Sequence, residues 1–195
     1  MKLDPGLNFF KRVFAVIAAA GCLALAPQAS ASMVPGKTSA AELSRSAQNT
    51  LQKLYARVPA AKALGKEAYA VLVFPSVTKA GLGIGGQYGE GTLIKGGKTV
   101  AYYNTAGASY GLQIGAQTYG YAMFFMNEAA LEQLDKTEGY EVGVGPSVVV
   151  VDEGMAKSMT TTTMKNDVYA FIFSQKGLMA GLGVQGNKIT RIHPK

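Results

Sequence analysis

The feature that most constrains the fold is a change of residue pattern at about Gly65. Before this point, a Ser39–Glu42 capping box predicts the start of a helix. Apolar or small residues then recur at helical spacing, at Leu43, Ala47, Thr50, Leu51 and Leu54. After it, short apolar runs alternate with glycines, which is typical of β-strands. The pattern predicts an N-terminal amphipathic helix followed by a β-rich region.

Turn and cap signals divide the β-rich region into elements. Thr92–Ile94 and Thr99–Tyr103 flank Lys95-Gly96-Gly97-Lys98, which predicts a hairpin with a Gly-Gly turn. Asn127 is expected to cap one mid-chain helix over residues 128–136. A further helical turn is expected over residues 59–64, with Pro59 at its start and Gly65 at its end. Other candidate strands cover residues 69–74, 107–116, 119–126, 142–151, 169–174 and 182–192.

These elements predict an α+β fold. We expect a single β-rich domain of antiparallel strands and hairpins, sandwich or barrel-like, carrying the N-terminal amphipathic helix and the mid-chain helix. One internal echo stands out, because Tyr69-Ala70 and Ala80–Gly83 recur 100 residues later as Tyr169-Ala170 and Ala180–Gly183. The echo predicts two related hairpins within one domain; chance similarity of glycine-rich sequence is the alternative.

The first 31 residues have the composition of a secretory signal peptide. Basic residues precede an apolar run, Val13–Leu25, that is too short to span a bilayer comfortably. Ala29-Ser30-Ala31 supplies small residues for cleavage between Ala31 and Ser32. We therefore expect residues 1–31 to be a signal peptide, 32–38 a linker and 39–195 the folded domain. The protein would be secreted across the inner membrane and be periplasmic or associated with the outer membrane.

Cys22 gives a second interpretation of the same segment. Ala20-Gly21-Cys22 resembles the end of a bacterial lipobox, in which the cysteine is acylated. Ala19 stands where a leucine is usual, and a better cleavage site follows, so soluble secretion is preferred. Lipidation at Cys22 remains the alternative.

Composition excludes several kinds of site. One cysteine and one histidine among 195 residues leave no basis for a cysteine zinc site or a histidine-centred catalytic site. The glycine-rich run Gly81–Gly86 is followed by more strand-like sequence, whereas a nucleotide loop needs a helix there. We therefore assign no catalytic, cofactor-binding or metal-ligating residue and expect no nucleotide or nucleic acid partner. The side chains of Leu82, Ile84 and Tyr88 are instead expected to pack into the core.

Basic residues on the first helices are the strongest functional signal. The chain has a formal net charge of +7, which favours anionic partners. On a helical wheel Arg45, Lys53 and Arg57 lie at about 0°, 80° and 120°, on one flank of the apolar stripe. Lys62 and Lys66 follow shortly after. This arrangement is typical of a helix that lies on an anionic membrane. A helix docked on the sheet with solvated bases is the alternative.

Several strings of residues, in their order, resemble the SYLF domain family. They are Ala68–Pro75, Lys79–Gly81, Gly86–Gly91, Gly111–Gln117, Gly143–Pro146 and Lys176–Gly181. The resemblance implies a compact β-rich domain with packed helices that binds anionic phospholipids without catalysis. Eukaryotic relatives also bind actin, but a signal peptide makes actin an unexpected partner here.

We therefore expect non-catalytic binding of anionic phospholipids through Arg45, Lys53, Arg57, Lys62 and Lys66. A structural or adhesive envelope protein and an actin-binding type of interaction module are the alternatives.

Overall fold

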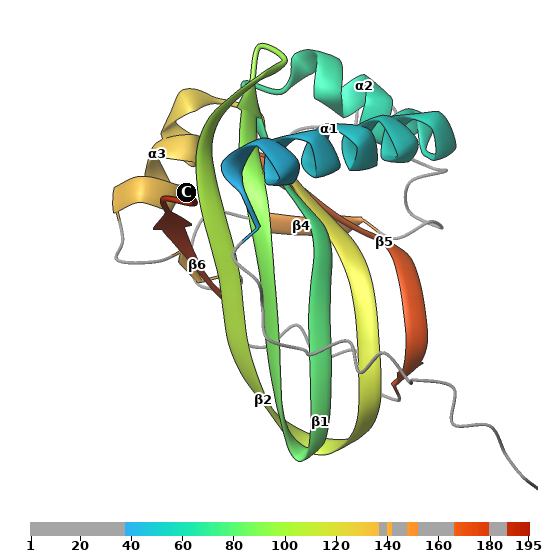
Figure 1. Ribbon diagram of the computed structural model, residues 1–195. Helices are drawn as coiled ribbons and strands as arrows, with labels where there is room; N and C mark the ends of the chain where they lie inside the picture. The colour runs from blue at the N-terminus through green and yellow to red at the C-terminus, as the bar shows by residue number, and fades with distance from the viewer. Residues whose placement is uncertain (1–37, 137–139, 142–147, 152–165, 180–186) are drawn as a thin grey trace, which may run out of the picture. The chain divides into compact units, whose positions relative to one another are not determined.

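The computed structural model describes residues 38–136, 140–141, 148–151, 166–179 and 187–195, all within the compact unit Gly36–Lys195 (Figure 1). The helices are α1 (Ala40–Arg57), α2 (Pro59–Glu67) and α3 (Glu128–Lys136). The strands are β1 (Ala70–Lys95), β2 (Lys98–Phe125), β3 (Tyr140–Glu141), β4 (Val148–Val151), β5 (Val168–Met179) and β6 (Asn187–Ile192). The predicted α+β class is confirmed.

Strand β2, which forms one long antiparallel hairpin with β1, is the centre of the sheet. The turn of this hairpin consists of Gly96 and Gly97, which have φ angles of 56° and 77°. Two consecutive positive φ angles match the tight turn that follows the natural twist of a hairpin, and glycine adopts them without strain. The two candidate strands at 107–116 and 119–126 are both parts of β2.

The remaining strands extend the sheet from the other edge of β2. That edge pairs with β6 near its beginning and with β5 near its end, both antiparallel. Next, β3 joins β6, and β4 runs parallel to β5. The result is one open, mostly antiparallel sheet of six described strands.

The hairpin doubles back on itself, so its two halves face each other (Figure 1). The pairing register shifts between Leu82 and Ile84, where both strands bend. Beyond the bend β1 returns so closely that a Cβ on Gly91 would lie 2.7 Å from the carbonyl oxygen of Val73. Only a residue without a side chain permits this approach. A single folded sheet thereby produces two layers.

The core has two parts, one on each side of this sheet. An inner cluster joins both halves of the hairpin with α3; it includes Leu72, Phe74, Leu93, Tyr103, Met123 and Leu134. An outer cluster lies under the two N-terminal helices; it includes Leu51, Leu54, Leu64, Val73, Phe124 and Phe171. Both clusters are made of side chains that are almost completely buried.

The expectation that Leu82, Ile84 and Tyr88 pack into the core is wrong. Leu82 is 77% exposed, Ile84 68% and Tyr88 41%. Alternation along a strand buries one face only where a second layer covers that face. Leu82 and Ile84 lie at the bend itself, beyond the region where the two halves of the hairpin face each other.

The predicted helix caps are confirmed, but one predicted helix end is not. The Ser39 hydroxyl accepts a hydrogen bond from the backbone N–H of Glu42, at 3.3 Å. Asn127 Oδ1 accepts from the backbone N–H of Ala130, at 2.8 Å. Gly65, however, does not end the second helix, because α2 continues to Glu67.

The two copies of the internal echo begin in β1 and β5, on opposite edges of β2, but the strand pairing does not reproduce their sequence offset of 100 residues. Ala70 of β1 and Val168 of β5 are both paired with Phe125, so the structural offset is 98 residues at that position. The Gly81–Gly86 copy lies in a strand, as predicted, whereas residues 180–186 lie outside the described residues. The predicted signal peptide, its cleavage site at Ala31 and Ser32, and Cys22 also lie outside the described residues and stay predictions.

Candidate membrane-binding site

The apolar stripe of α1 packs on the sheet. Leu43, Ala47, Leu51 and Leu54 are at most 5% exposed. Leu51 and Leu54 belong to the same buried cluster as Val71 and Phe124, which lie on the sheet below. The docked arrangement of the helix is therefore the correct one, and these leucines are not available to enter a bilayer.

All five predicted contact residues are exposed to solvent; they are Arg45, Lys53, Arg57, Lys62 and Lys66. Within the part of the chain that the structure describes, none of the five forms an ion pair with a carboxylate. Their charges are therefore available to an anionic partner.

The structure divides the five residues between two helices. Arg45, Lys53 and Arg57 lie on one flank of α1. Lys62 and Lys66, four residues apart, lie on one face of α2. Across α1 and α2 together, only Glu42 and Glu67 are acidic. The outer helical layer thus carries an excess of positive charge.

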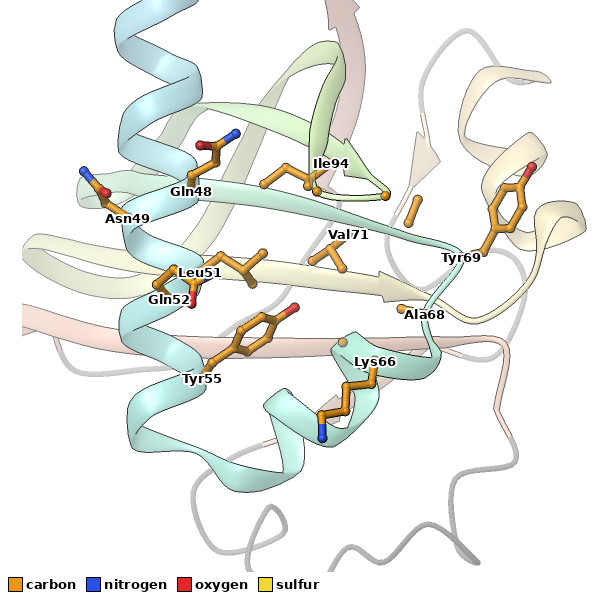
Figure 2. A pocket seen from close by; sticks show the side chains of 14 residues that line it. Gln48, Asn49, Leu51, Gln52, Tyr55, Lys66, Ala68, Tyr69, Val71 and Ile94 are labelled. Carbon is orange, nitrogen blue, oxygen red and sulfur yellow. The ribbon is translucent and has the colours of Figure 1, made fainter.

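A groove of about 510 Å³ lies on the other flank of α1, between this helix, the end of α2 and the hairpin turn (Figure 2). Its apolar floor is formed by Leu51, Val71 and Ile94. Its polar lining includes Gln48, Gln52 and the side chain of Lys66. This volume is in the range of small-ligand sites. Lys66 is the one residue of the predicted set that lines the groove.

Tyr55 closes one side of this groove and points toward α2 (Figure 2). Its ring packs at a tilt against Phe124, with 6.3 Å between the ring centroids. Burial raises the pKa of the Tyr55 phenol to about 12, because an anionic phenolate would lose hydration there. The Tyr55 phenol therefore stays neutral in the range between pH 10 and 12, in which a free tyrosine ionises.

A second cluster ties the hairpin turn to α3. Lys95 Nζ lies 3.8 Å from the centroid of the Tyr69 ring and also donates a hydrogen bond to the Tyr69 hydroxyl. The Tyr69 hydroxyl in turn donates to Glu128 Oε1, at 2.5 Å. Lys95 and Lys98 are both exposed, but Lys95 is held by these contacts and is therefore the weaker candidate for binding a partner.

Sequence reasoning missed both the groove and this cluster. The groove combines residues from α1, α2 and β1, and no local spacing signals that assembly. Gly65 was the one available hint, since a glycine inside a helix often has a packing reason.

Two other kinds of feature find no support among the described residues. No group of three or more His, Cys, Asp or Glu side chains in this part of the chain could hold a metal ion. None of the described helices is long and apolar enough to cross a membrane.

Comparison with known families supports a binding role. Residues 106–193 match the family model Ysc84, described as "Las17-binding protein actin regulator". A search of curated proteins gave no significant match. The matched segment contains most of β2 and continues to β6, whereas α1 and α2 precede it. The match agrees with the SYLF motifs and indicates a binding module of the lipid- or actin-related kind. Residues 106–193 of this chain are therefore similar to the Ysc84 (SYLF) family.

Proposed function

We propose that this protein binds anionic phospholipid membranes through the exposed basic residues of α1 and α2. The observation that carries the proposal is the set of five exposed cations, Arg45, Lys53, Arg57, Lys62 and Lys66, without carboxylate partners among the described residues. Each basic residue near an anionic surface contributes about 1 kcal/mol of binding free energy. Several together produce useful affinity without a deep pocket.

The buried stripe of α1 determines how such binding would occur. Because Leu51 and Leu54 pack on the sheet, the helix would lie on the headgroups rather than enter the hydrocarbon. Binding of this kind is electrostatic and is screened over about 8–10 Å at physiological ionic strength. It should therefore weaken steeply as salt is added.

The test is co-sedimentation with vesicles that contain phosphatidylglycerol, compared with vesicles of phosphatidylcholine alone. The variant Arg45→Gln/Lys53→Gln/Arg57→Gln removes three charges and no buried group. At about 1 kcal/mol per charge it should lose about 3 kcal/mol, or roughly a hundredfold in partitioning. Its thermal unfolding should match that of the parent.

A matched control removes the same charge elsewhere. Lys188→Gln/Arg191→Gln/Lys195→Gln changes three exposed bases in β6 and the residues after it, none of which forms an ion pair with a carboxylate side chain among the described residues. This control should retain most of the affinity if the α1 flank is the contact. Equal losses in the two triple variants would mean that only net charge matters. Unchanged binding of the α1 variant at low salt would reject the proposal.

An actin-related role is the second candidate, because the description of the matched family names actin regulation. Co-sedimentation with filamentous actin measures it directly. Binding to actin that survives the α1 triple substitution would place that activity on another surface.

A further inference from the structure

The bend of the folded hairpin carries the most exposed apolar side chains among the described residues. Leu82 is 77% exposed and Ile84 68%. Single exposed apolar residues are common on protein surfaces. Here, however, two large aliphatic side chains lie two residues apart at one end of the folded hairpin, and Tyr88, 41% exposed, follows on the same strand.

The bend is tightly closed. A Cβ on Gly81 would lie 2.5 Å from the Cα of Gly85, so the backbone on its two sides is in direct contact. No space remains inside the bend for a large side chain. Leu82 and Ile84 therefore lie on the outside of this end of the folded hairpin. Such an end suits a deformable bilayer, whereas a folded protein partner would need a matching depression.

Charge around the bend points to an anionic surface. No acidic residue occurs in residues 76–89, 99–125 or 168–179; the nearest one along β1 is Glu90, which accepts a hydrogen bond from the Tyr88 hydroxyl. Lys176 is exposed, and its Cα partner Thr118 is also paired with Thr78, four residues before Leu82. Apolar residues backed by an exposed base are the combination found in interfacial membrane anchors.

We propose that Leu82 and Ile84 insert into the interface of an anionic bilayer, with Lys176 facing the headgroups. This inference rests on the proposed membrane function but uses a different part of the molecule. The helices pack over Val71, Val73 and Ile94, whereas the bend is at the opposite end of the hairpin (Figure 1). Each contact can therefore be removed without touching the other.

The first experiment measures vesicle partitioning of Leu82→Ser/Ile84→Ser on membranes that contain phosphatidylglycerol. Removing two inserted aliphatic side chains should reduce partitioning by about tenfold or more. Val100→Ser is the matched control, because Val100 is also an exposed strand residue, at 51%, but lies near the hairpin turn. It should bind as the parent does, and all variants should keep the parent's unfolding temperature.

The second experiment uses the absence of tryptophan from the chain. Ile84→Trp introduces a single fluorescent reporter at the bend, and Val100→Trp introduces one at the other end of the hairpin. On adding the vesicles, the indole emission of the Ile84→Trp variant should shift to shorter wavelength and be quenched by brominated acyl chains. The Val100→Trp variant should show neither change.

The outcomes separate this inference from the proposed function. Vesicle binding of the Ile84→Trp variant with its emission unchanged would overturn the insertion and leave the α1 contact standing. A shifted emission at the bend, together with undiminished binding of the α1 triple variant, would overturn the α1 contact and support the insertion of the bend. An emission shift that appears without lipid and grows with protein concentration would show that the bend packs on a second copy, which also overturns the proposal.

Discussion

The ring of Tyr55 occupies the space that a side chain at residue 65 would need. A Cβ added to Gly65 would lie 2.5 Å from Tyr55 Cζ and closer still to the hydroxyl. Gly65 is thus a packing residue inside α2 rather than a helix terminator. It lets α2 approach α1 at the groove.

This relationship predicts a substitution whose effect changes sign. Gly65→Ala should destabilise the protein by about 1–3 kcal/mol, because overpacking outweighs the helix propensity gained. In a Tyr55→Ala background the clash is absent, and the same substitution should become stabilising by about 1 kcal/mol. Urea unfolding of the four proteins measures both effects. If the changes in the free energy of unfolding caused by Gly65→Ala and Tyr55→Ala simply add in the double variant, the contact between the two residues is contradicted.

Leu54→Ala distinguishes a packed helix from an inserted one. Leu54 is 2% exposed beneath α1, so its truncation should lower the free energy of unfolding by about 2–5 kcal/mol. The fraction that remains folded should bind anionic vesicles with the parent's affinity. Normal stability combined with weak binding would instead place Leu54 in the membrane.

Thr92→Val should stabilise the protein. Thr92 is fully buried, and its hydroxyl has no hydrogen-bond partner among the described residues. Valine has nearly the same shape and removes an unpaired polar group, so a gain of about 1 kcal/mol is expected. Thermal unfolding measures the change; a loss of stability would mean that the hydroxyl has a partner.

Stability should respond to the ionisation of Tyr55 at alkaline pH. Its pKa is raised from 10 to about 12 on folding, so the neutral phenol is favoured in the folded state. The contribution is complete below pH 10 and is lost as pH rises from 10 toward 12. The parent should therefore lose stability over this range faster than Tyr55→Phe. If the urea midpoints of the parent and of Tyr55→Phe fall in parallel as the pH rises, the raised pKa of Tyr55 is contradicted.

How much the sequence could predict depended on how local each feature is. The caps at Ser39 and Asn127 and the Gly96-Gly97 turn are set by neighbouring residues, and all were predicted correctly. The folding back of the hairpin is not local. It brings Gly91 beside Val73, and nothing in the alternation of glycines indicates where a strand reverses.

The same limit applies to the candidate site. The basic flank of α1 follows from helical spacing and was predicted, and its role in binding stays a prediction. The exposure of Leu82 and Ile84 was predicted wrongly, because alternation identifies a strand face but not whether a second layer covers it.

The arrangement of β2 also has a consequence for folding and truncation. One edge pairs with β1 through a local hairpin, whereas the other edge, among the described residues, pairs with β5 and β6 alone, which come from the last 28 residues of the sequence. Hairpin contacts close short loops first, and the more distant pairings form at greater entropic cost. A chain that stops before Val168 would leave a long edge of β2 unpaired. Such an edge is a template for intermolecular strand pairing, so C-terminal truncations should aggregate rather than fold as smaller domains.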